Sequence, residues 1–216
     1  MAEVFNFDNL FAGNVCPVVT DAVTIAAGTG SLERGSVLGK ITKTLGTPAS
    51  GTNDGDAEIS GVEIKSNAQI GDYRMVCIVA PSSAGANDAT FAVYAPDGSR
   101  LEDAIQGTEY SNGHIKFTIG NATATDSAIG DSFTVPVMAG SGAYVLVNSA
   151  NTDGSGVVEC ILAEDIESSA ETQKAAVYLT GEFNESELVF GGTDTAAMHK
   201  AAARAKGIFF KTAVSA

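Results

Sequence analysis

The feature that most constrains the fold is a repeated alternation of apolar and polar residues in short runs. In residues 114–119 every second side chain is apolar, and residues 131–137 repeat the pattern. Such a period of two places one face of a β-strand on a core and the other in water. Glycine is abundant, with 24 residues, tryptophan is absent, and turn-forming dipeptides separate the runs. The sequence therefore predicts a mainly β protein.

Further strands are expected where short apolar runs lie between turn signals. They cover residues 21–26, 37–43, 72–80, 90–95, 157–162, 175–180 and 187–190. Within residues 131–137, Pro136 has no N–H to donate to a neighbouring strand, which favours a place at a sheet edge.

One short helix is expected near the C-terminus. Asp194 is a suitable N-cap, and Gly207 is a suitable stop signal. Helical spacing predicts that the helix buries an alanine-rich face, made of Met198, Ala201, Ala202 and Ala205.

Two soft stretches, residues 46–56 and 148–156, divide the chain. They are rich in residues that favour turns and offer few side chains to bury. A chain of 216 residues forms one large domain or two small ones. The β-rich segment between the two stretches contains enough strands for a small two-layer module.

Composition excludes several functional classes. The formal net charge of −14 disfavours nucleic acid as a partner. No apolar run approaches the roughly 18 residues that span a bilayer, and the N-terminus does not resemble a signal peptide. We therefore expect a soluble protein made inside a cell, with no membrane partner. Cys16, Cys77 and Cys160 form no CxxC pair, so they are expected to be small buried hydrophobic residues.

No residue pattern indicates catalysis. His114 and His199 lack partners at metal-ligand spacing, and no HExxH or GxSxG motif occurs. Calcium prefers oxygen ligands, but the acidic stretch from Asn53 through Asp54 and Asp56 to Glu58 does not match the twelve-residue calcium loop. We expect no catalytic residues, metal or cofactor, and predict that the protein is not an enzyme.

Residues 1–13 are unusually apolar for a segment that precedes the first strand. Two interpretations are open: the apolar side chains pack on their own domain, or the segment is an extended arm that adds a strand to a partner's sheet. The residues concerned are Val4, Phe5, Phe7, Leu10 and Phe11.

Motifs near both ends of the chain carry a resemblance to a known family. They are PVVTD at 17–21, LERGSVLGK at 32–40, TDGSG at 152–156, ILAED at 161–165, GEFNE at 181–185 and AAARAKGI at 201–208. In this order they resemble the lambda-like head decoration proteins of tailed bacteriophages. The middle of the chain is similar to the β-rich insert of longer members, in FAVYAPDG at 91–98, FTI at 117–119 and GDSF at 130–133.

The resemblance implies a domain organisation. Residues 1–13 would be a capsid-binding arm, and residues 14–44 and 141–216 a discontinuous, compact β-rich core with a short C-terminal helix. Residues 45–140 would be an inserted, small β-sandwich-like domain. Apolar residues late in the chain are candidates for the core or for a trimer interface: Val177, Leu179, Phe183, Ile208, Phe209 and Phe210.

The resemblance also implies a function. The protein would be made in the bacterial cytoplasm and would bind the major capsid protein on the outside of the expanded head. There it would act as a homotrimer at local three-fold positions and stabilise the shell against the pressure of packaged DNA. An alternative is a β-sandwich binding module, displayed on the virion, that recognises a host-surface carbohydrate or protein through Tyr94, Asp97, Tyr110 and His114.

Overall fold

The computed structural model describes residues 9–167 and 169–213. The chain divides into two compact units, residues 1–42 with 141–216 and residues 43–140. We call the first the core unit and the second the inserted unit. Both consist mainly of strands, and one short α-helix lies near the C-terminus, so the predicted fold class is confirmed.

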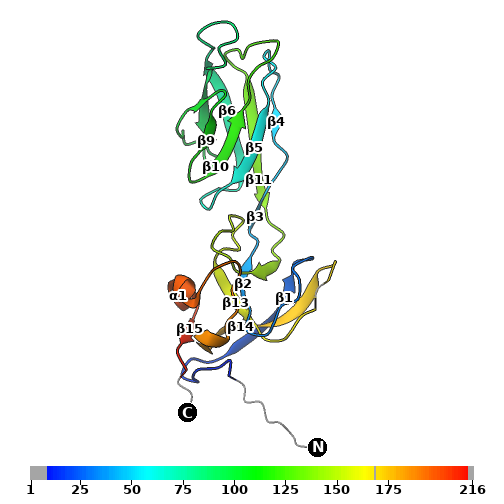
Figure 1. Ribbon diagram of the computed structural model, residues 1–216, viewed down its shortest axis with the longest axis vertical. Helices are drawn as coiled ribbons and strands as arrows, with labels where there is room; N and C mark the ends of the chain where they lie inside the picture. Colours follow the sequence, from blue (N-terminus) through cyan, green and yellow to red (C-terminus); the bar gives the residue numbers. More distant parts are fainter. Residues whose placement is uncertain (1–8, 168, 214–216) are drawn as a thin grey trace, which may run out of the picture. The chain divides into compact units, whose positions relative to one another are not determined.

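The core unit is a small closed barrel with one extra strand. The strand order is β1-β12-β2-β13-β14-β15, and β1 also pairs with β14, which closes the first five strands into a ring (Figure 1). Each of these five strands therefore has a neighbour on both sides, although β1 and β12 meet only at Ile25 and Tyr144. The strands are β1 (Val19–Ile25), β2 (Val37–Lys40), β12 (Tyr144–Leu146), β13 (Val158–Leu162), β14 (Gln173–Asn184) and β15 (Ile208–Lys211).

The long strand β14 changes partners along its length. Its first part pairs antiparallel with β1, and from Gly181 onward it pairs parallel with β15. Gly181 has a φ of +149°, a value that residues with a side chain rarely adopt. The absence of a side chain at this position therefore permits the change of partner.

Helix α1 (Ala196–Ala205) follows a 3-10 turn, η1 (Glu185–Glu187), and buries a different face from the predicted one. Its buried residues are His199 and Ala203, whereas Met198 is 57% exposed. The buried histidine is tolerated because its Nε2 lies 2.7 Å from Asp194 Oδ2 and its ring stacks on Phe190. The prediction that the alanine-rich face is buried was therefore wrong. It followed the spacing of apolar residues alone, which does not show that Asp194 provides a polar partner for a buried His199.

The inserted unit is a β-sandwich. One sheet has the order β3-β11-β6-β7-β8, with β4 also paired to β11, and the other has the order β5-β10-β9 (Figure 1). Buried residues of both sheets form one hydrophobic core. The strands are β3 (Lys43–Leu45), β4 (Ala49–Ser50), β5 (Ile59–Ile64), β6 (Gly71–Val79), β7 (Thr90–Tyr94), β8 (Ala104–Ile105), β9 (Glu109–Ser111), β10 (Ile115–Ile119) and β11 (Ser132–Ala139).

Strand β11 lies inside its sheet, so the edge position predicted from Pro136 is wrong. On one side β11 pairs with β6, and on the other with β3 and then β4. The Pro136 carbonyl accepts a hydrogen bond from the Gly46 N–H, so the proline nitrogen faces the gap between β3 and β4. The hydrogen-bond ladder between β11 and its neighbours β3 and β4 is already interrupted at this gap. The N–H that Pro136 lacks would therefore have no regular strand partner.

We predict that residues 43–140 fold as an isolated domain, because every residue of their hydrophobic core lies within this range. Far-UV circular dichroism and a cooperative denaturation curve would measure this. Phe117→Ala should lower the free energy of unfolding of the segment by about 3–5 kcal/mol. Thr118→Ala, on the opposite face of β10, is the matched control and should cost less than about 1 kcal/mol. An unfolded isolated segment would contradict the prediction.

Candidate interaction surface

The described part of the N-terminal segment, residues 9–19, adds a short strand to the end of β14. The Ala12 N–H donates to the Glu182 carbonyl at 3.0 Å, and the Asn184 N–H donates to the Leu10 carbonyl at 2.8 Å. Between these bonds, Phe11 and Phe183 form an antiparallel bridge. The Asn184 side-chain amide also donates to the Asn9 carbonyl at 3.2 Å. The backbone of the segment is therefore anchored from Asn9 onward.

Two of the predicted arm residues pack on their own unit. Leu10 is only 3% exposed and belongs to the core-unit cluster that contains Phe183. The Phe11 ring lies 5.2 Å from the Tyr178 ring and 5.4 Å from the Phe183 ring, measured between centroids. For Leu10 and Phe11 the structure thus supports packing on the same domain. The other predicted arm residues, Val4, Phe5 and Phe7, lie outside the described residues.

A buried carboxylate fixes the next turn of the segment. Glu182 is 5% exposed, forms an ion pair of 2.7 Å with Lys211, and accepts the Val15 N–H at 3.2 Å. The Lys211 ammonium, followed by the Val15 N–H, holds the pKa of Glu182 below its ordinary value. A Cβ on Gly13 would clash with this carboxylate, so the segment passes closest to Glu182 at a glycine. This network was not predicted, since its members are distant in sequence.

The candidates for core or trimer interface fall into two groups. Four are at most 3% exposed and belong to hydrophobic clusters of the core unit: Val177, Phe183, Ile208 and Phe210. Leu179 and Phe209 are half-buried and retain accessible surface. Of the six, only these last two are available for contact with another molecule without unfolding.

Beyond the anchored turn, the segment exposes three valines, which we call the valine patch. Val15 is 85% exposed, Val18 43% and Val19 47%. Val19 is in register with Thr180, next to Leu179, while Phe209 is in register with Glu182. Because successive strand residues point to opposite faces, Leu179 lies on the other face of β14, where it packs against the cluster that contains Val177. Phe209 pairs beside Glu182, whose carboxylate accepts the Val15 N–H, so Phe209 and Val15 lie in the same region of the core unit. Exposed apolar side chains that occur close together in the chain are typical of contact surfaces.

The four residues suggested for carbohydrate or protein recognition do not form one site. Tyr110 is buried and stacks on Phe117 with ring centroids 4.7 Å apart. The His114 Nδ1 lies 3.0 Å from the Tyr73 hydroxyl. Tyr94 lies on the other sheet, and Asp97 occupies the turn after it, where it accepts the Ser99 N–H.

The acidic stretch considered for calcium anchors loops. The Asp56 carboxylate accepts hydrogen bonds from the Thr123 hydroxyl and N–H and from the Ala124 N–H. These donors, led by the Thr123 hydroxyl, lower the pKa of Asp56 to about 2. Asn53 Oδ1 accepts the Ser132 N–H. No group of three or more potential metal ligands occurs among the residues that the structure describes.

The fold and the exposed apolar surface are typical of a β-rich structural protein that binds other proteins. It consists of a closed barrel that anchors an N-terminal segment, and of a β-sandwich inserted in the chain of the barrel. A family model described as bacteriophage lambda head decoration protein D matches residues 3–207, and the chain belongs to this family. The protein is thus a structural component of a phage head, and the family is not a class of enzymes. Within the described ranges, no helix is long and apolar enough to cross a membrane.

Other comparisons add little. No curated protein matches the chain. Two crystal structures of FlgL from Xanthomonas campestris match with TM-scores of 0.32 and 0.31 and 17% identity, over 49% of this chain and 33% and 32% of theirs. The flagellar hook junction protein FlgK from Burkholderia pseudomallei matches with a TM-score of 0.30 and 21% identity, over 56% of this chain and 21% of its own. The chain spans a third or less of each, and TM-scores this low carry no conclusion about fold or function.

We predict that Leu10→Ala lowers the free energy of unfolding of the core unit by about 2–5 kcal/mol, because it leaves a cavity beside Phe183. Val15→Ala in the same segment is the matched control, and it should change stability by less than about 0.5 kcal/mol because Val15 is 85% exposed. Denaturant titration of the full chain measures both. Equally small effects would mean that Leu10 is not held in the core in solution.

Proposed function

We propose that the protein is a cement of the phage head, bound as a homotrimer to the outside of the expanded capsid at local three-fold positions. Its partner is the major capsid protein, and binding stabilises the shell against internal DNA pressure. Membership of the decoration family supports the association with the head. The observation that carries the proposal is the anchoring of the N-terminal segment on β14 from Asn9 onward, in a segment that also exposes Val15, Val18 and Val19.

The anchoring gives the proposed arm a defined base. Residues 9–13 are held on β14 by backbone hydrogen bonds and by Leu10, so the capsid-binding arm is best assigned to the residues before Asn9. These include Val4, Phe5 and Phe7, which supply apolar side chains for a partner surface. In this proposal the arm adds to a sheet edge of a capsid subunit, where main-chain bonds give affinity and the side chains give register.

The proposed trimer uses the surface around β14. A ring of three copies needs two different patches on each copy, because a three-fold interface is heterologous. The valine patch, together with Phe209, supplies apolar surface for one of them, and the half-buried Leu179 is a candidate for the other. A bound subunit that touches both the shell and its neighbours gains effective concentration at each further contact. Moderate contacts in many copies therefore add up to a stable coat.

Deleting residues 2–8 should leave the melting temperature unchanged and abolish binding to expanded heads in a pelleting assay. The deletion spares Leu10 and the hydrogen bonds that residues 9–12 form with β14, so the fold of the core unit is preserved. A deletion of residues 2–13 is the comparison and should also lower stability, because it removes Leu10 and Phe11 from the core. Undiminished binding by the shorter deletion would remove the arm from the mechanism.

The double variant Val18→Glu, Val19→Glu should weaken head binding by at least about tenfold, which corresponds to about 1.4 kcal/mol. Charged side chains would then face an apolar neighbour in the trimer, while the fold is spared because both valines are substantially exposed. Val157→Glu, at a valine of the same unit that is 49% exposed, is the matched control. Binding isotherms on purified heads measure the effect. If the double variant binds and clusters in threes like the parent, the valine patch lies outside the interface.

A further inference from the structure

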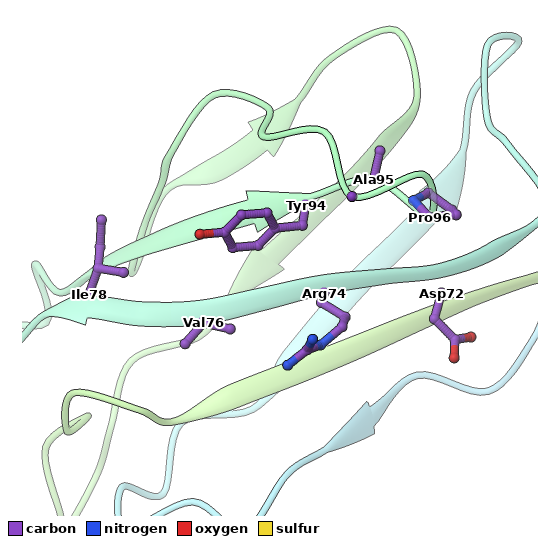
Figure 2. Close-up of a pocket in the computed structure, with 8 residues that line it drawn as sticks. Asp72, Arg74, Val76, Ile78, Tyr94, Ala95 and Pro96 are labelled. Atoms are coloured by element: carbon purple, nitrogen blue, oxygen red, sulfur yellow. The ribbon is translucent and has the colours of Figure 1, made fainter.

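The outer face of the larger sheet of the inserted unit carries a groove with a volume of about 450 Å³. A volume of this order is typical of small-ligand sites. Strand β6 forms the floor, and the end of β7 with the following turn forms one wall (Figure 2). The lining residues are Asp72, Arg74, Val76, Ile78, Tyr94, Ala95, Pro96 and Gly98.

The arrangement follows from strand geometry. Alternate residues of β6 point away from the sandwich core, so Asp72, Arg74, Val76 and Ile78 stand in a row on the outer face. Arg74 is in register with Tyr94 on β7, which places an aromatic ring beside a guanidinium. Figure 2 shows these two side chains with Val76 in the middle of the groove, Asp72 and Pro96 at one end and Ile78 at the other.

The charged groups of the groove are available to a ligand. Asp72 and Arg74 are both exposed, and within the described residues neither side chain has an ion pair or hydrogen bond. Other cations of the same unit are engaged: Arg100 pairs with Asp103, and Lys116 pairs with Glu63. The groove therefore offers the several N–H donors of the Arg74 guanidinium beside an aromatic ring, and a carboxylate acceptor, Asp72, at one end.

The same features exclude other ligand classes. A phosphate or another anion would meet the Asp72 carboxylate and a protein of net charge −14. A peptide could not extend the sheet here, because β6 lies between β11 and β7, and β7 lies between β6 and β8. A purely apolar ligand would remove the Arg74 and Asp72 charges from water without compensation.

We propose that this groove binds a neutral sugar of an oligosaccharide. One face of the sugar ring packs on Tyr94, while its hydroxyls accept hydrogen bonds from Arg74 and donate to Asp72. Val76 and Ile78 contact the apolar parts of the next residue of the chain. This binding activity is separate from attachment to the head, since every lining residue belongs to the inserted unit.

The test is saturation-transfer NMR and calorimetry on the full chain. The probes are three neutral trisaccharides, maltotriose, cellotriose and triacetylchitotriose, with trigalacturonate as the acidic comparison. At least one neutral trisaccharide should bind with a dissociation constant in the millimolar range or below and more tightly than trigalacturonate. Tyr94→Ala and Arg74→Ala should each weaken this binding at least about tenfold, whereas Tyr94→Phe should retain most of it.

Lys116→Ala, a change on the opposite sheet, is the matched control and should leave affinity unchanged. Thermal melts establish that each variant is folded, and head binding by the same variants should equal that of the parent. The absence of binding to all three neutral probes would overturn the proposal. So would tighter binding of trigalacturonate, or affinity that is insensitive to both Tyr94→Ala and Arg74→Ala. Loss of head attachment in the arm deletion, by contrast, bears only on the cement function.

Discussion

The core unit depends on the pairing of one strand, β14. Its first part closes the barrel against β1 and β13, and its second part holds β15 on one side and the N-terminal segment on the other. The two parts meet at Gly181, where the backbone takes a conformation that favours glycine. Barrel closure, the C-terminal strand and the base of the proposed arm are therefore consequences of a single element, and a disturbance of β14 would affect all three.

Much of the fold could be predicted from the sequence, because burial on one face of a strand leaves a period of two. The clean alternation around Phe117 predicted a strand that the structure contains. Predictions from local sequence patterns failed where a residue elsewhere in the chain stabilises an arrangement that the pattern disfavours. Pro136 is tolerated inside a sheet because the neighbouring ladder breaks opposite it, and His199 is buried because Asp194 compensates it. Neither the interrupted strand pairing nor the contact between His199 and Asp194 can be inferred from the pattern of apolar residues around Pro136 or His199.

The candidate surface was harder to predict for the same reason. Residues 1–13 are rich in apolar side chains, but such a pattern cannot separate a segment that packs on its own unit from one that docks elsewhere. The deciding contacts, between Phe11 and Phe183 and between Val15 and Glu182, join residues more than 160 positions apart. The groove on β6 and β7 could not be predicted, because the sequence indicates the two strands but not their pairing, which places Arg74 beside Tyr94.

A protein that coats a shell in many copies must contact its proper partners without joining its sheets to those of other copies. Closure of the barrel gives each of its five strands a neighbour on both sides, which reduces the free edge that other copies could pair with. In the inserted unit the edge strands β3, β4, β8 and β9 have two or three residues each, which limits the length of any ladder they could extend, whereas the edge strand β5 has six. A net charge of −14 adds repulsion between copies at long range. Attachment must then come from short-range contacts that overcome this repulsion, and in the function proposed above the N-terminal segment with its exposed valines provides the surface for them.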